Sequence, residues 1–189
     1  MRAILILFLS AFTFVFSYAQ SGEKLANAAI ELTKQDVVYD PSYFSIAYPN
    51  GDVPEDRGVC TDVIIRAYRK LGIDLQKEVH EDMRSNFSVY PKNWGLTRTD
   101  RNIDHRRVPN LMTYFERQGA SQMVTKNPDN YLPGDVVTWS LGGGLTHIGI
   151  VVGKKSSDGK RPLIVHNIGE GQVIEDCLFS FKITGHYRW

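Results

Sequence analysis

Three residues of this 189-residue chain have the types and settings that nucleophilic chemistry needs. Cys60 stands just before the apolar run 63–71, His147 opens the run 147–152, and His166 lies near the end of the run 163–167. A thiol beside an imidazole, with a second polar group that orients the imidazole, is the arrangement that thiol-dependent acyl transfer requires. We therefore expect Cys60 to act as nucleophile, His147 as base, and His166 as the residue that holds the His147 ring.

The stretch around Cys60 predicts a helix that begins at the cysteine. Cys60, Ile64, Ala67, Tyr68 and Leu71 recur at helical spacing, and Gly72 ends the pattern. Unpaired N–H groups and the positive dipole end at a helix N-terminus favour a thiolate, so we expect a lowered pKa for this thiol. The N–H of Cys60 would then be one donor to the oxyanion. The alternatives are a small buried residue or one half of a disulfide with Cys177.

The two histidine runs read as neighbouring strands joined by the polar loop 153–162. A hairpin centred near Ser156 and Ser157 would place His147 approximately opposite His166, with Cβ atoms about 4.5–5.5 Å apart. A shift of one residue would replace His166 by Asn167 as the third residue. Two histidines and a cysteine could also bind zinc, but a tight ligand spacing such as His-Glu-x-x-His is absent. We therefore expect no metal and no cofactor.

The remaining periodicity indicates which elements position these residues. Helical spacing is found in residues 23–34, 75–87 and 109–118, and β-branched runs in residues 135–139, 148–152, 163–165 and 183–187. Helices followed by a mainly antiparallel sheet predict an α+β fold, with N-terminal helices packed on a sheet or half-barrel. The polar, irregular segment 74–110 is typical of one wall of a cleft.

The first nineteen residues have the pattern of a secretory signal peptide. Arg2 is followed by an apolar run, and Ser17-Tyr18-Ala19 supplies the small residues of a cleavage site. We expect a secreted, periplasmic or extracellular protein whose residues 20–189 form a single domain without membrane association. Without Arg2, the chain has 21 Lys and Arg and 21 Asp and Glu, which gives a net charge of zero. This balance argues against a general nucleic-acid binder, which would have an excess of basic residues.

Three separated motifs carry a resemblance to a known family. A cysteine stands at a helix start, Pro133-Gly134-Asp135-Val136-Val137 precedes a strand, and His147-Ile148-Gly149-Ile150-Val151-Val152-Gly153 leads to a second strand closed by a polar residue. This order resembles the NlpC-type peptidoglycan hydrolases of the papain-like superfamily. The runs 79–83 and 104–110 are similar to an uncharacterised family of secreted bacterial proteins within it. The resemblance implies a papain-like fold, cleavage of amide bonds in cell-wall peptides, and the triad Cys60, His147 and His166.

The chain departs from the NlpC pattern at the nucleophile. That family usually reads Asp-Cys-Ser-Gly, whereas this chain reads Val59-Cys60-Thr61-Asp62. The acidic residue that meets a peptide amine in many members is therefore missing, and Asp62 or Asp56 are candidates to replace it. His105 and Arg106 are candidates to bind substrate carboxylates. The cleaved bond stays open among a γ-D-glutamyl–diamino acid bond, a cross-link and the sugar–peptide amide.

Two other functions remain open at this point. One is a non-catalytic wall-binding module in which Cys60 is bridged to Cys177. The other is a papain-like acyl hydrolase that acts on a non-wall substrate. The sequence identifies no inhibitor or immunity protein as a partner.

Overall fold

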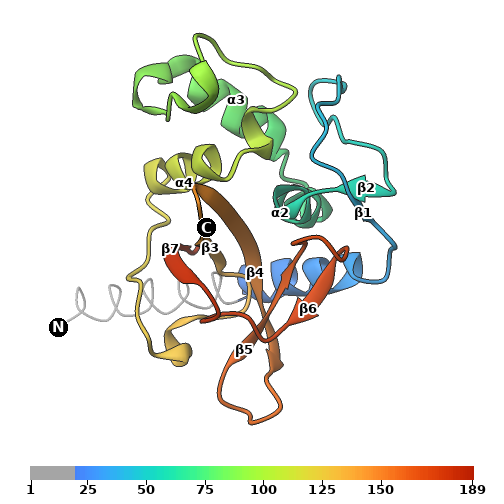
Figure 1. Ribbon diagram of the computed structural model, residues 1–189, viewed down its shortest axis with the longest axis vertical. Coiled ribbons are helices and arrows are strands. Elements are labelled where there is room, and N and C mark those ends of the chain that lie inside the picture. Colours follow the sequence, from blue (N-terminus) through green and yellow to red (C-terminus); the bar gives the residue numbers. More distant parts are fainter. Residues whose placement is uncertain (1–19) are drawn as a thin grey trace, which may run out of the picture.

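A computed structural model describes residues 20–189 of the chain (Figure 1). The predicted signal peptide, residues 1–19, lies outside the described residues. Within the described part, no helix is long and apolar enough to cross a membrane. The helices are residues 20–32, α2 (Cys60–Lys70), α3 (Leu75–Ser85) and α4 (Val108–Arg117), with short 3₁₀ turns at Phe87–Val89, Asn93–Gly95, Asp104–Arg106 and Pro128–Asn130. The strands are β1 (Val38–Tyr39), β2 (Arg57–Gly58), β3 (Val136–Gly142), β4 (Leu145–Lys155), β5 (Pro162–His166), β6 (Val173–Glu175) and β7 (Lys182–Tyr187).

Five strands form one antiparallel sheet in the order β6-β5-β4-β3-β7. The central strand, β4, is also the longest, and it pairs Trp139↔His147 with β3 and Ile150↔Val165 with β5. Side chains alternate between the two faces along a strand, so His147 shares a face with Trp139. The chain has the predicted α+β fold.

The sheet carries a hydrophobic cluster on each face. The larger cluster contains Ile148, Ile150 and Val152 of β4 together with buried residues of α2, α3 and α4. The smaller cluster contains Val137, Trp139, Val151 and Ile164, which have the opposite strand parity, and it also takes in Cys177 and Leu178. The helices thus cover one face, and segments before β3 and after β6 cover the other.

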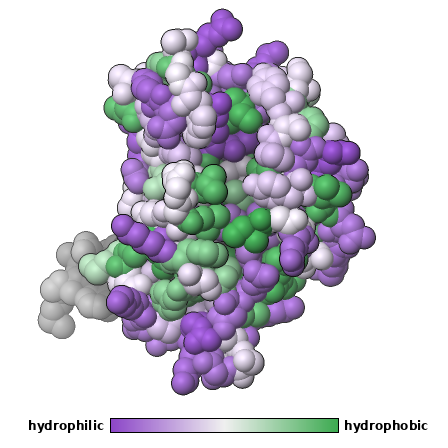
Figure 2. Space-filling model, viewed as in Figure 1, coloured by the Kyte–Doolittle hydropathy of each residue, from purple (hydrophilic) through white to green (hydrophobic). Residues whose placement is uncertain are grey.

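The two views show how these parts are disposed. In Figure 1, α3 and α4 gather at one end of the molecule, and the β4–β5 hairpin projects at the other end. Figure 2 shows apolar residues across the middle of this face, with hydrophilic residues towards both ends.

The elements follow the sequence pattern with small shifts at their ends. The helices predicted at 75–87 and 109–118 are α3 and α4, and the four predicted strands are β3, β4, β5 and β7. Strand β6 was not predicted, because its three residues are too few to show a periodicity. Segment 74–110 contains α3 and three 3₁₀ turns rather than an irregular loop.

Candidate active site

Cys60 is the first residue of α2, as the sequence predicts. Val59 precedes the helix in an extended conformation, and its N–H donates to the carboxylate of Asp62 at 2.7 Å. This bond satisfies a backbone donor at the helix start, which otherwise has no partner within the helix. The bond therefore fixes the direction in which the chain enters at Cys60.

A buried ion pair anchors the same helix turn. Arg106 donates to both carboxylate oxygens of Asp62, at 2.9 and 3.0 Å, and each side chain is only 2% exposed. The Thr61 hydroxyl donates to the carbonyl of Arg106 at 3.1 Å. The prediction of a substrate-binding role for Asp62 and Arg106 therefore needs correction, because both groups are buried and engaged with each other.

The other two candidates for substrate binding are His105 and Asp56, and they differ in burial. His105 is buried, and burial together with the charge of Arg106 lowers the pKa of its imidazole to about 3. Its Nδ1 has no hydrogen-bond partner among the described residues. Asp56 is exposed, and its carbonyl accepts from Val38 N–H at 2.8 Å. We interpret His105 as a structural residue, and the role of Asp56 stays a prediction.

The thiol of Cys60 lies against β4. The backbone N–H groups of Ile148, Thr61 and Cys60 itself lie close enough to the sulfur to favour its thiolate form. The sulfur therefore meets the strand at the residue that follows His147. Figure 1 shows α2 beside β4, and the two elements are in contact.

The electrostatics of the thiol differ from the sequence expectation. Burial, followed by the charge of Asp62, raises the pKa of Cys60 to about 12, and the backbone donors oppose this rise. The expected lowering of the pKa by the helix N-terminus is therefore wrong, because burial outweighs it. At neutral pH Cys60 is a thiol, and it needs a base to become a nucleophile.

The imidazole of His147 contacts the rings of His166 and Trp139. Its Nε2 lies 2.9 Å from Nδ1 of His166, and its ring is tilted against Trp139 with centroids 5.8 Å apart. Burial, followed by the charge of His166, lowers the pKa of His147 to about 3. The ring is therefore neutral at physiological pH and can accept a proton.

The strand register differs from the one that the sequence suggested. Ile150↔Val165 and Val151↔Ile164 place Gly149, rather than His147, opposite His166. The two rings still meet diagonally because Gly149 has no side chain. A Cβ at Gly149 would lie 3.2 Å from the Cβ of His166 and 2.6 Å from Cγ2 of Ile164.

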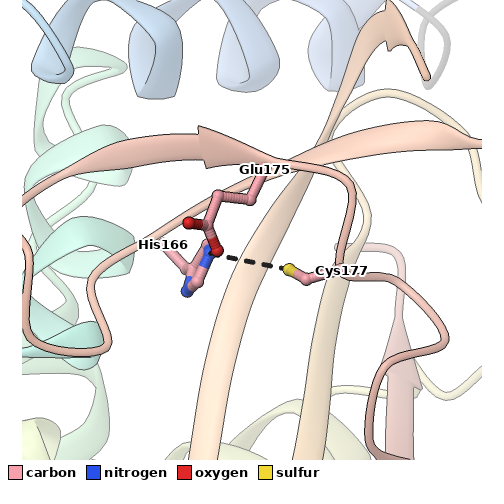
Figure 3. A group of neighbouring side chains, drawn as sticks. All are labelled: His166, Glu175 and Cys177. Atoms are coloured by element: carbon pink, nitrogen blue, oxygen red, sulfur yellow. Dashed lines mark hydrogen bonds and ion pairs between the residues drawn. The ribbon is translucent and has the colours of Figure 1, made fainter. Parts of the chain in front are cut away.

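Beyond His147, His166 contacts two further polar groups (Figure 3). Its Nε2 lies 2.9 Å from Oε2 of Glu175 and 3.5 Å from Sγ of Cys177. Burial lowers the pKa of His166, and the nearby Glu175 opposes that shift.

These partners determine where the ring protons lie. A carboxylate only accepts hydrogen bonds, so Nε2 of His166 carries the proton and its Nδ1 accepts from Nε2–H of His147. This assignment leaves Nδ1 of His147 with a free lone pair. A free lone pair on that nitrogen is what a general base for Cys60 requires.

Asn167 and Cys177 do not take the roles considered for them as alternatives. The Asn167 side chain donates to the carbonyl of Gly58 at 3.3 Å and accepts from Gly169 N–H at 3.1 Å, so His166 and not Asn167 meets His147. Cys60 and Cys177 are both free cysteines, and the bridge between them that the sequence allowed is absent from the described residues.

Two residues near this site were not predicted. Glu175 comes from the three-residue strand β6, where an acidic residue gave no periodic signal. Tyr39 lies on β1, which runs parallel to β2 just before Cys60. Burial, followed by the charges of Cys60 and Asp62, raises the pKa of Tyr39, so its hydroxyl keeps its proton.

Comparison with known proteins gives the family. A family described as a domain of unknown function (DUF1287) matches residues 26–189. The chain belongs to this family. A protein of Escherichia coli (strain K12), the "Uncharacterized protein YijF", is 49% identical over 177 residues, which cover 94% of this chain and 86% of that protein. A crystal structure of an N-acetylmuramoyl-L-alanine amidase from Bacteroides uniformis is 13% identical, with a TM-score of 0.49, and the match covers 89% of this chain and 97% of that one.

Proposed function

We propose that this protein is a thiol-dependent hydrolase that cleaves amide bonds in bacterial cell-wall peptides. The observation that carries the proposal is the hydrogen-bonded series His147–His166–Glu175, which leaves a lone pair on Nδ1 of His147, while the sulfur of Cys60 lies near the N–H of the next residue, Ile148. The resemblance of the three motifs to NlpC-type hydrolases of the papain-like superfamily supports the substrate class.

In the first half of the reaction, Sγ of Cys60 attacks the carbonyl carbon of the scissile amide. Nδ1 of His147 takes the thiol proton as the carbon–sulfur bond forms, and it then protonates the leaving amine. The products of this half are a free amine and a thioester on Cys60. The scheme requires Nδ1 of His147 to come within hydrogen-bond reach of the sulfur during this step.

In the second half, water replaces the amine. His147 accepts a proton from the attacking water, and the thioester carbon–sulfur bond breaks to release the peptide acid. The same proton returns to the Cys60 sulfur, so the enzyme ends in its starting state.

The other residues of the series stabilise the charge that forms on His147. When His147 becomes an imidazolium, its Nε2–H donates to His166, and His166 donates in turn to the Glu175 carboxylate. A carboxylate at the end of such a series favours the charged ring by electrostatic attraction. Glu175 is therefore a positioning residue, because it acts on the substrate only through the histidines.

The donors that surround the thiol also suit the developing oxyanion. The N–H groups of Cys60 and Thr61 lie at the start of α2, and the protonated Tyr39 lies on β1, which pairs with β2 just before Cys60. Fixed donors at this position stabilise negative charge on the substrate oxygen without reorganisation. We assign the oxyanion position to the space between the start of α2 and β1.

The direct test is digestion of purified peptidoglycans of several chemotypes by the mature chain. We expect new fragments with the wild type and none with Cys60→Ala or His147→Ala, as identified by mass spectrometry. Cys177→Ala is the matched control, because it removes the other buried thiol and should leave digestion intact. Unchanged turnover in Cys60→Ala would disprove the thiol mechanism, and the absence of fragments from every chemotype would disprove the substrate class.

A labelling experiment separates the base from the nucleophile without any substrate. Because burial holds Cys60 in the thiol form, its alkylation by iodoacetamide should depend on His147. We expect His147→Ala to slow labelling of Cys60 while labelling of Cys177 stays the same. Equal Cys60 labelling rates in the two proteins would contradict a role for His147 as base.

We also propose that the protein acts outside the cytoplasm, on the basis of the pattern in residues 1–19. The mass of the protein purified from a cell envelope fraction should correspond to a chain that begins at Gln20. A full-length mass would contradict export through cleavage at this site.

A further inference from the structure

Cys177 lies beside the orienting histidine but has no part in the proposed hydrolysis. Its Sγ is 3.5 Å from Nε2 of His166, and Oε2 of Glu175 is 2.9 Å from the same nitrogen. Figure 3 shows the three side chains converging from the end of β5 and from the strand β6 with the segment after it. Their three ligand atoms lie within 4.8 Å of one another, and no other three such side chains in residues 20–189 come as close.

These distances fit a small divalent cation. Zinc binds nitrogen at 2.0–2.1 Å and sulfur at 2.3 Å in tetrahedral geometry, so its ligand atoms are about 3.3–3.6 Å apart. The nitrogen–sulfur distance of 3.5 Å already matches, and the nitrogen–oxygen distance of 2.9 Å needs to grow by a few tenths of an ångström. The Glu175 side chain is 45% exposed, so it can move outward, and solvent can reach a fourth ligand position.

We propose that His166, Glu175 and Cys177 form a binding site for Zn²⁺, and that the bound ion turns off the base at His147. Imidazole, carboxylate and thiolate are all ligands that zinc accepts in proteins. One carboxylate and one thiolate neutralise the charge of the ion. The binding site stands independently of the hydrolase, whereas its effect on catalysis rests on the proposed function.

The effect follows from the positions of the ring protons. Zinc takes the lone pair on Nε2 of His166, so the single proton of that neutral ring moves to Nδ1. Nδ1–H of His166 then donates to Nε2 of His147, whose own proton must lie on Nδ1. Both rings keep one proton each, but His147 no longer has a lone pair to offer to Cys60.

The proton balance provides a measurable quantity. An ordinary cysteine has a pKa of about 8.5, so Cys177 is a thiol in the metal-free protein at neutral pH. Zinc binds the thiolate, and binding therefore releases one proton for each ion. Titration calorimetry in buffers that differ in ionisation enthalpy measures this number.

The binding test uses Cys60→Ala, which removes the proposed nucleophile and so prevents zinc from binding to its thiol. The metal-free protein is titrated with zinc alone under reducing conditions. We expect one ion per chain with release of one proton, and at least tenfold weaker binding after Cys177→Ala in the same background. Equal affinities with and without Cys177 would overturn the site, as would zinc binding that requires Cys60.

Two controls protect this result. Cys177→Ser keeps the side-chain size, and thermal melts of the metal-free variants verify that each one folds. Cobalt substitution adds a spectroscopic readout, because a thiolate ligand gives a charge-transfer band that should be present in Cys60→Ala and absent in the double variants. A band that survives removal of Cys177 would assign the thiolate to another residue and overturn the site.

The activity test is separate. In wild type, zinc should reduce kcat at least tenfold and a chelator should restore it. Without zinc, Cys177→Ala should have the kcat of the wild type, and zinc should not reduce it. Equal inhibition of both proteins would overturn the switch. A chain that binds zinc as described but cleaves no wall fragment would overturn the hydrolase and support the site.

Discussion

Nε2 of His147 lies 2.9 Å from Nδ1 of His166, and the two rings stand at 78° to each other. Both rings are neutral at physiological pH, so only one of the two nitrogens that face each other carries a proton. Glu175 determines which one, because its carboxylate accepts a hydrogen bond from Nε2–H of His166 on the opposite side of that ring. Three residues on three neighbouring strands thus determine which nitrogen of His147 is available to Cys60.

The series predicts a defined effect of removing Glu175. In chelator-treated protein, Glu175→Ala should lower kcat about 10- to 100-fold with little change in KM, because both tautomers of His166 become accessible. Nitrogen chemical shifts of the two rings should show mixed tautomers in the variant and one tautomer in the wild type. Asp176→Asn is the matched control, since Asp176 pairs with Arg161 at 2.7 Å and should leave kcat unchanged. Unaltered ring tautomers in Glu175→Ala would contradict the positioning role.

Replacement of His166 tests which residue is third in the site. His166→Ala should reduce kcat about 10²- to 10⁴-fold, because the His147 ring loses both its orientation and its charge stabilisation. Asn167→Ala should mainly lower the free energy of unfolding, by about 1 kcal/mol, through loss of the bond to Gly58. Steady-state kinetics and urea unfolding measure the two effects. A larger fall in kcat for Asn167→Ala than for His166→Ala would reverse the assignment.

Gly149 allows the two histidines to meet, so an added methyl group should separate them. In Gly149→Ala the new Cβ would lie 2.6 Å from Ile164 Cγ2 and 3.0 Å from the Val165 carbonyl oxygen, which forces the strands apart. We expect a loss of about 1–3 kcal/mol in stability and a marked fall in kcat. Gly153→Ala on the same strand is the control, because its Cβ would meet no atom closer than 3.8 Å. Equal behaviour of the two variants would show that the register is not constrained at Gly149.

The buried pair of Asp62 and Arg106 should be essential for the start of α2. Asp62→Asn leaves the Arg106 charge without its partner in a buried position, and we expect a loss of about 3–5 kcal/mol of unfolding free energy. Chemical denaturation measures this loss. Arg57→Met provides the comparison, since the pair of Arg57 and Asp40 is exposed to solvent on the arginine side and should contribute little to the free energy of unfolding. Similar losses in the two variants would contradict the anchoring role.

Stability should fall in acid because of His105. Its pKa is about 3 in the folded chain and 6.5 in the unfolded chain, so between these values the unfolded state binds the proton more readily. The positive charges of Arg106 and Arg69 add to the effect of burial on the pKa of His105. The free energy of unfolding should drop by up to about 1.4 kcal/mol per pH unit through this residue as the pH falls below 6.5. Urea unfolding at pH 7 and pH 5 gives the change in the free energy of unfolding between the two pH values. This change should be smaller in His105→Phe than in the wild type, and equal changes would disprove the assignment.

The sequence by itself determined the elements and the approximate positions of the reactive residues. Apolar spacing located α2, α3, α4 and most strands, because burial of one face imposes a period that is visible without coordinates. The polar residues that interrupt these patterns, Cys60, His147 and His166, stood out for the same reason. The sequence also indicated that the β4–β5 hairpin brings the two histidines together.

The tertiary structure decided the chemistry around those residues. The pKa of Cys60 rises because the whole fold buries it, a quantity that no local motif contains. His166 rather than Asn167 meets His147 because of a register that depends on Gly149. Glu175 and Cys177 join the site only because β6 pairs with β5, which brings residues after an unpatterned loop to the same sheet face. Periodicity is a property of neighbours along the chain, whereas proton positions and ligand distances depend on atoms that only the folded chain brings together.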